Sequence, residues 1–109
     1  MRDEAQERLE LLSAIQDLGY ESLRYSIFNE YGPGEWEVVI EFDDSKQVYN
    51  VYATMDRASY NKKLEFDNFE DAKNKFLEKL DLTIEINKLF VENGEIPEYS
   101  SPLWDSETN

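Results

Sequence analysis

Glu37 and Glu41 are the two acidic residues whose spacing most invites a catalytic interpretation. Two carboxyl groups can serve as general acid and general base, and glycoside hydrolysis needs little more than such a pair at a defined separation. Residues four apart on a strand lie about 13 Å apart, however, which exceeds that separation. The chain has no His and no Cys, and it shows no glycine-rich phosphate loop, nucleophile elbow or zinc-ligand spacing. The sequence therefore indicates a protein that is not an enzyme and holds no cofactor.

A metal site is the next candidate, because calcium takes carboxylate oxygens as ligands. Asp43, Asp44 and Asp56 supply such oxygens, but the alternating ligand pattern of a calcium-binding loop is missing. The run Asp-Asp-Ser-Lys at residues 43–46 is instead typical of a turn. We therefore predict a turn there and no bound metal.

The charge of the chain is strongly unbalanced. Its 109 residues include 25 Asp and Glu but only 11 Lys and Arg, for a formal net charge of −14. A field of this sign attracts basic partners, speeds their capture and repels nucleic acid. Phosphate binding needs clustered Lys and Arg, whereas the lysines here lie among acidic residues. We therefore expect a basic protein partner and no direct binding of nucleic acid.

The segment from Tyr25 to Ser45 concentrates this charge, because it holds six acidic residues and no Lys or Arg. Within it, apolar and acidic residues alternate with the two-residue period of a strand. The apolar set, which we expect to face the helices, is Trp36, Val38, Ile40 and Phe42. Glu35, Glu37 and Glu41 would then project from the opposite face of the sheet.

An acidic surface with aromatic residues at its edge is typical of a protein interface. The sequence therefore predicts a partner-binding surface on this segment. Its candidate residues are Glu30, Tyr31, Trp36, Glu37, Glu41, Asp43 and Asp44. The alternative is that charges on an open sheet face only discourage aggregation.

Four strands are expected. A strand near residues 23–28 is followed by turn residues at 31–34 and a second strand at 36–42, so we predict a hairpin. Residues 48–54 form a third strand, rich in β-branched and aromatic residues, and residues 64–66 form a short fourth. Together they predict an antiparallel meander.

Two helices flank these strands. Residues 3–18 show the helical period, and Gly19 supplies a stop signal. Their apolar residues are Leu9, Leu11, Leu12, Ile15 and Leu18. A second helix begins at an N-cap, Asp67 or Asn68, and runs toward the stop signal Asn93-Gly94. Its apolar stripe is Phe69, Ala72, Phe76, Leu80 and Ile84.

An unbroken second helix would be about 36 Å long, which is longer than a domain of this size can cover. We therefore expect either a bend or break near residues 81–83 or an end that projects. The order of elements predicts an α+β fold, in which a four-stranded antiparallel meander has the N-terminal helix and the long C-terminal helix packed on one face.

The expected single domain spans residues 1–94. Residues 95–109 contain acidic residues and prolines but no base, which is typical of a loose tail. Tyr99, Leu103 and Trp104 offer the alternative that this tail docks onto the domain.

The chain has no sequence feature of a membrane protein. No apolar run approaches the roughly 20 residues of a membrane span, and the N-terminus lacks the apolar core of a signal peptide. The lack of cysteine suits a reducing compartment. We therefore expect a cytoplasmic protein that is a monomer or a weak dimer and does not bind membranes.

Residues 18–20, Leu-Gly-Tyr, and residues 23–30, Leu-Arg-Tyr-Ser-Ile-Phe-Asn-Glu, resemble a family of bacterial polymorphic-toxin immunity proteins, immunity protein family 59. The similarity continues through residues 51–54, residues 57–59, residues 66–68, Ala72 and Phe76. It covers residues 17–80 and leaves out the chain after Gly94.

The resemblance implies an α+β protein that binds a cognate toxin domain in the cytoplasm of the producing cell and neutralises it. A toxin that cuts nucleic acid has a basic active site that an acidic surface can cap, so a nuclease toxin would suit the charge of this chain. Arg57 is predicted to pair with a carboxylate and shape its loop, and the alternative is that it reaches a partner.

Two other hypotheses stay open. One is an acidic mimic of nucleic acid that inhibits a nuclease of another system. The other is a non-enzymatic structural or adaptor domain that associates with itself, in which the charge serves only solubility.

Overall fold

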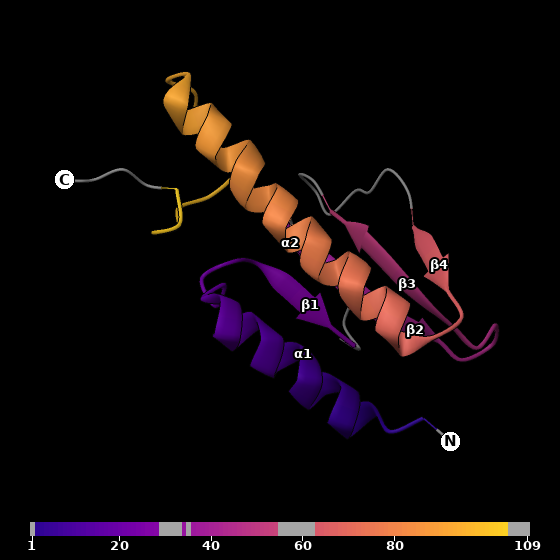
Figure 1. Cartoon of the computed structure of the whole chain (residues 1–109). Helices are drawn as coiled ribbons and strands as arrows, with labels where there is room; N and C mark the ends of the chain where they lie inside the picture. Colours follow the sequence, from indigo (N-terminus) through magenta and orange to yellow (C-terminus); the bar gives the residue numbers. More distant parts are fainter. Residues whose placement is uncertain (1, 29–33, 35, 55–62, 105–109) are drawn as a thin grey trace.

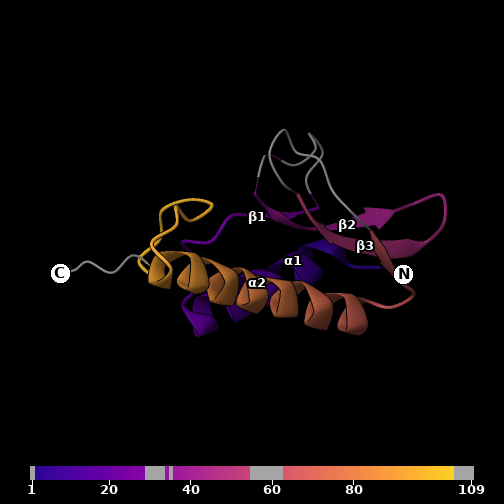
Figure 2. The ribbon, with the colours of Figure 1, turned by 90° about the horizontal axis from the view of Figure 1, so that it is seen from above.

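The computed structural model describes residues 2–28, 34, 36–54 and 63–104. Its elements, in chain order, are α1 (Glu4–Leu18), β1 (Tyr25–Ile27), β2 (Val38–Asp43), β3 (Val48–Ala53), β4 (Leu64–Phe66) and α2 (Phe69–Glu92). The strands form one layer, and both helices lie on the same face of it (Figure 1, Figure 2). The predicted α+β class is confirmed. None of the helices among the described residues combines the length and apolar character that crossing a membrane requires.

The strands lie side by side in the order β1-β2-β3-β4. β3 is antiparallel to both β2 and β4, in agreement with the predicted meander. β1 and β2 are parallel, with Ser26 opposite Val39, so the predicted hairpin between them is wrong. Phe28, directly after β1, has a φ of 50°, and this left-handed conformation turns the chain out of the strand. Alternating side chains reveal the two faces of a strand but not its direction, so the sequence pattern could not distinguish the two pairings.

The helix-facing side of the sheet carries the core. Val38 and Ile40 of β2 and Val51 of β3 are buried in one cluster with Phe76 and Leu80 of α2. The predicted inward face of β2 is therefore confirmed, and so is the apolar stripe predicted for α2.

α1 begins and ends where its capping residues predict. The Asp3 side chain accepts a hydrogen bond from the backbone N–H of Gln6, and Gly19 ends the helix with a φ of 74°. Leu11 and Ile15 are fully buried. The other three apolar residues that mark the helical period are exposed, namely Leu9, Leu12 and Leu18. α1 runs beside α2 at the border of the helical layer (Figure 1), so only a narrow stripe of it meets the core.

α2 is one continuous helix of 24 residues. The Asn68 side chain caps its start by accepting a hydrogen bond of 2.9 Å from the backbone N–H of Asp71, and Gly94 follows its end with a φ of 76°. The expected break near residues 81–83 is therefore wrong. The alternative expectation holds, since the C-terminal half of α2 extends beyond the sheet (Figure 2).

Residues 95–104, the C-terminal segment, pack back onto the domain. Trp104 is 5% exposed and belongs to the core cluster, where its ring meets that of Tyr99 edge to face. The hydroxyl of Tyr99 accepts a hydrogen bond of 3.0 Å from the backbone N–H of Arg24, and the hydroxyls of Ser22 and Ser101 lie 2.8 Å apart. This part of the expected tail is therefore docked, between the end of α1 and the end of α2 (Figure 1).

Candidate functional site

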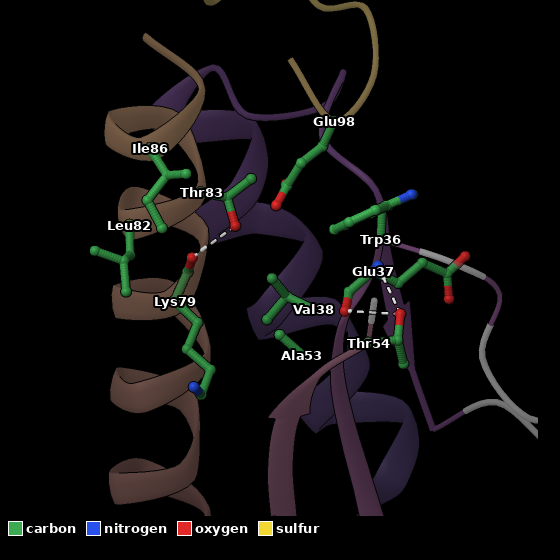
Figure 3. A pocket seen from close by; sticks show the side chains of 10 residues that line it. All are labelled: Trp36, Glu37, Val38, Ala53, Thr54, Lys79, Leu82, Thr83, Ile86 and Glu98. Carbon is green, nitrogen blue, oxygen red and sulfur yellow. Dashed lines mark hydrogen bonds between the residues drawn. The ribbon is translucent and has the colours of Figure 1, made fainter. Parts of the chain in front are cut away.

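A cleft of about 270 Å³ lies between the C-terminal half of α2 and the sheet, at the end where β2 begins and β3 ends (Figure 3). The sheet side is lined by Trp36, Glu37, Val38, Ala53 and Thr54. The helix side is lined by Lys79, Leu82, Thr83 and Ile86. Glu98 of the C-terminal segment completes the lining. Three parts of the chain that are distant in sequence thus build one concave site.

Thr54 holds the sheet side of the cleft in place. Its hydroxyl accepts a hydrogen bond of 2.9 Å from the backbone N–H of Glu37 and donates one of 2.8 Å to the carbonyl of Gly34. The backbone N–H of Thr54 donates to the carbonyl of Glu37 at 2.8 Å. Between these anchors Trp36 has a φ of 58°, a conformation that bulky residues rarely adopt. The anchors therefore fix the backbone on both sides of Trp36, from which the indole reaches the cleft.

Asn87 positions the carboxylate of Glu98. Asn87 is completely buried in α2, and its Oδ1 accepts a hydrogen bond of 2.7 Å from the backbone N–H of Glu98. Its Nδ2 donates to Glu98 Oε1 at 3.1 Å and to the carbonyl of Thr83 at 2.8 Å. Figure 3 shows the Glu98 carboxylate pointing into the cleft. Both the backbone and the side chain of Glu98 are thus held before any partner arrives.

The exposed side of α2 next to the cleft mixes acidic and aliphatic residues. Leu82 is 50% exposed and Ile86 is 36% exposed, and both also line the cleft. Asp81 and Glu85 are exposed beside them. These four residues, Asp81, Leu82, Glu85 and Ile86, lie on adjacent turns and form a continuous ridge on the helix. We call it the α2 ridge. Large apolar groups next to carboxylates are typical of surfaces that bind proteins.

The pKa of Tyr20 reflects the negative charge on the side of the α2 ridge that is farther from the cleft. Its hydroxyl donates a hydrogen bond to the Asp81 carboxylate. That bond, together with burial and the nearby charges of Asp81 and Glu85, raises the pKa of Tyr20 to about 12. Asp17 and Glu21 are exposed on either side of Tyr20 in the sequence. This acidic region was not predicted from the sequence, because its residues come from α2, from the end of α1 and from the turn after it, and no local pattern reveals that these parts meet.

Two of the predicted partner-binding residues reach the cleft. Trp36 lines it, as does Glu37. The carboxylate of Glu37, however, accepts a hydrogen bond of 2.9 Å from the backbone N–H of Gly34 and points away from the cleft (Figure 3). Glu30, Tyr31 and Glu35 lie outside the described residues.

Glu41 is placed on the helix-free face of the sheet, where it takes part in a polar network. Its Oε1 accepts a hydrogen bond of 3.1 Å from the hydroxyl of Tyr52. Its Oε2 lies 3.3 Å from Nζ of Lys63 and accepts a weaker bond from Asn50. Glu41 was predicted to bind a partner from this face, and in the structure its carboxylate has a lysine partner from the other side of β3.

Asp43 and Asp44 lie at the opposite end of β2 from Trp36. β2 has six residues, which corresponds to about 20 Å, so these acids do not share a surface with the cleft. Asp43 Oδ1 accepts hydrogen bonds from the hydroxyl and the N–H of Ser45 and from the N–H of Lys46. The Ser45 hydroxyl and these N–H groups hold the pKa of Asp43 below its usual value. Asp43 therefore forms the turn that the sequence predicted at residues 43–46.

No group of three or more acidic side chains within the described ranges is arranged to hold a metal ion. The groups that line the cleft are instead an indole, four aliphatic side chains, two hydroxyls, one ammonium and the carboxylate of Glu98, together with Glu37, whose carboxylate points away. Such a mixture suits recognition of a side chain or a segment of another protein.

A small α+β domain with a preformed cleft and an acidic and aliphatic ridge beside it has the features of a protein-binding module. The chain belongs to the immunity protein 59 family, whose family model matches residues 5–105. This match extends beyond residues 17–80 at both ends, and it includes the C-terminal segment that supplies Glu98. No curated protein and no solved structure matches the chain.

Proposed function

We propose that this protein is an antitoxin that binds a cognate secreted bacterial toxin and neutralises it by capping a basic site on the toxin. Family membership supports the immunity role. The net charge of −14 supports a basic partner, because a field of this sign accelerates the capture of a positively charged protein and excludes nucleic acid. Binding alone carries out this function, in the cytoplasm of the producing cell, with no cofactor and no catalytic step.

The single observation that supports a docking site is the α2 ridge beside the cleft. Leu82 and Ile86 offer exposed aliphatic area, and Asp81 and Glu85 surround it with negative charge. Interfaces gain affinity from buried apolar anchors and gain on-rate and specificity from complementary charge. The ridge offers both within two turns of one helix.

Of the partner-binding residues predicted from the sequence, we retain Trp36 and Glu37 at the edge of the proposed contact. We assign Glu41 and Asp43 to the structure of the sheet and of its turn, because their carboxylates are engaged there. Asp44 lies beside Asp43, away from the cleft, so it serves as a control position.

The test begins with affinity capture of the tagged protein from the producing cell, with washes at low and high salt and identification by mass spectrometry. We expect a toxin domain from the C-terminus of a secreted protein, and we expect high salt to weaken its retention. Expression of that domain alone should stop growth, and co-expression with this protein should restore it. Capture of nothing but further copies of this chain would favour the self-associating domain instead.

Charge reversal then locates the contact. Glu85→Lys on the α2 ridge and Asp44→Lys on the far turn make the same change in net charge. We expect Glu85→Lys to slow association with the toxin domain at least ten-fold, whereas Asp44→Lys changes it about two-fold through the overall field. Equal effects of the two variants would overturn the proposed contact and leave only long-range attraction.

A further inference from the structure

We propose that the cleft receives one basic side chain of the toxin, an arginine or a lysine, whose cationic end meets the Glu98 carboxylate while its alkyl part lies against Trp36 and Ile86. This inference rests on the proposed function and adds the chemistry of the partner residue. It is carried by three features of the described chain: a preoriented carboxylate, an aromatic and aliphatic lining, and the place of the one lysine of the cleft.

The first feature is the preoriented carboxylate. Glu98 Oε1 accepts one hydrogen bond, from Asn87, and the carboxylate points into the cleft (Figure 3). A carboxylate has about four acceptor positions, so Glu98 can accept further bonds from a cationic donor. Because Asn87 and the backbone bond already fix the side chain, binding a cation requires little additional ordering of Glu98.

The second feature is the lining. Trp36 lies on the sheet side of the cleft, and Leu82 and Ile86 lie across from it on α2. Lysine and arginine bury their alkyl parts on apolar surface while the charged end stays polar. The face of an indole ring also attracts a cation within about 6 Å of its centre. The lining therefore suits a long basic side chain better than it suits a short polar or an acidic one.

The third feature is Lys79. Its amine lies at the opposite end of the cleft from the Glu98 carboxylate, about one further turn along α2 from Thr83 (Figure 3). A bound cation is attracted by Glu98 and repelled by Lys79, so its charged end is directed toward the C-terminal segment. The cleft is thus negative at the Glu98 end and positive at the Lys79 end. This arrangement predicts whether a change of Lys79 strengthens or weakens binding of a cation.

The direct test uses N-acetyl-arginine-N-methylamide as a probe, and the citrulline analogue, which has the same shape without the charge, as its control. Binding is followed by NMR on the indole N–H of Trp36 and the methyl groups of Leu82 and Ile86. We expect a saturable shift of these signals with the arginine probe and none with the citrulline analogue. Equal shifts with both probes, or shifts spread over the whole acidic surface, would overturn the inference.

Three variants test the assignment of residues. Glu98→Gln keeps an oxygen that accepts the bond from Asn87 and removes only the charge. It should therefore lower the affinity for the arginine probe about five-fold. Glu95→Gln makes the same change in charge in the same segment but outside the cleft. Its affinity for the probe should stay within about 1.5-fold of that of the parent protein. Lys79→Gln should strengthen binding about two-fold, because it removes the repulsion. A loss of affinity in Lys79→Gln would contradict the proposed orientation.

The same variants separate this inference from the proposed function. If the toxin domain is captured and Glu98→Gln holds it as tightly as Glu95→Gln does, the protein is an antitoxin but the cleft does not receive a basic side chain. If no toxin domain is captured while the arginine probe binds the cleft, the proposed function fails and the cleft remains a site for cationic side chains.

Discussion

Asn87 and Glu98 are joined by a pair of hydrogen bonds that connect the C-terminal half of α2 to the C-terminal segment. Asn87 Oδ1 accepts from the backbone N–H of Glu98 at 2.7 Å, and Asn87 Nδ2 donates to Glu98 Oε1 at 3.1 Å. A buried polar side chain in a helix is destabilising unless its groups are paired, and here both ends of the amide are used. This one residue therefore both closes the fold and orients the carboxylate of the cleft.

Asn87→Ala should lower the free energy of unfolding by about 3 kcal/mol, because it leaves the backbone N–H of Glu98 without its buried acceptor and opens a small cavity. Urea denaturation followed by circular dichroism measures the change. Asn74→Ala, at an exposed position of the same helix, is the matched control and should stay within about 0.5 kcal/mol of the parent protein. Equal stabilities of the two variants would show that the segment is not held by this amide.

Trp104→Ala tests whether the C-terminal segment contributes to the core. The Trp104 indole N–H donates to the carbonyl of Tyr99 at 2.8 Å and its ring is buried, so we expect a loss of about 3 kcal/mol of stability. Ile96 lies in the same segment but is 91% exposed, and Ile96→Ala should have almost no effect. If both variants unfold at the same urea concentration as the parent protein, residues 95–104 act as a tail outside the domain.

Arg2 ties the N-terminus to an aromatic cluster. Its guanidinium lies 4.3 Å from the ring centre of Phe42 and 4.5 Å from that of Phe28, and its Nε lies 2.8 Å from Glu7 Oε1. Arg2→Met keeps much of the apolar chain and removes the cation, so it should lower stability by about 1.5 kcal/mol in thermal unfolding. Lys46→Met removes an exposed ion pair with Glu65 and should change stability by less than about 0.5 kcal/mol.

Tyr20 should titrate well above the ordinary pKa of a tyrosine. Its folded pKa of about 12 exceeds its ordinary value of 10, because the neutral hydroxyl donates to Asp81. The stabilisation is therefore fully present below pH 10 and is lost as the pH rises from 10 through 12. NMR titration of the tyrosine ring carbons measures this pKa directly. Asp81→Asn should bring it back toward 10, whereas Glu92→Gln, near the end of α2, should leave it near 12.

Much of the fold could be predicted from the sequence, because local patterns report local structure. The alternation in residues 38–42 identified the buried face of β2, and the caps Asn68, Gly19 and Gly94 marked helix ends. The sequence left two outcomes open for α2, a break near residues 81–83 or a projecting end, and the structure shows the projecting end. The C-terminal half of α2 is supported by residues 95–104, and that contact is not visible in the pattern of the helix itself.

The candidate site was predicted only in part. Trp36 was selected as a partner-binding residue, because an aromatic residue beside acids is a local signal, and the structure places it in the cleft lining. Glu98 and Ile86 were not, because nothing in their neighbourhoods in the sequence shows that they meet Trp36. Glu41 was selected for its charge alone, and the lysine that compensates it comes from 22 residues further along the chain.

The sequence by itself determined the class of this protein: a folded α+β domain with a net charge of −14, without His or Cys, and a member of an immunity protein family. Composition and periodicity depend only on the type of each residue and its place in the sequence. The fold class can therefore be inferred from them without a structure. Only the tertiary structure decided which acids remain available to a partner. The carboxylate of Glu41 is engaged by Tyr52 and Lys63, whereas that of Glu98 is directed into a cleft, and both outcomes depend on contacts between residues that are distant in the sequence.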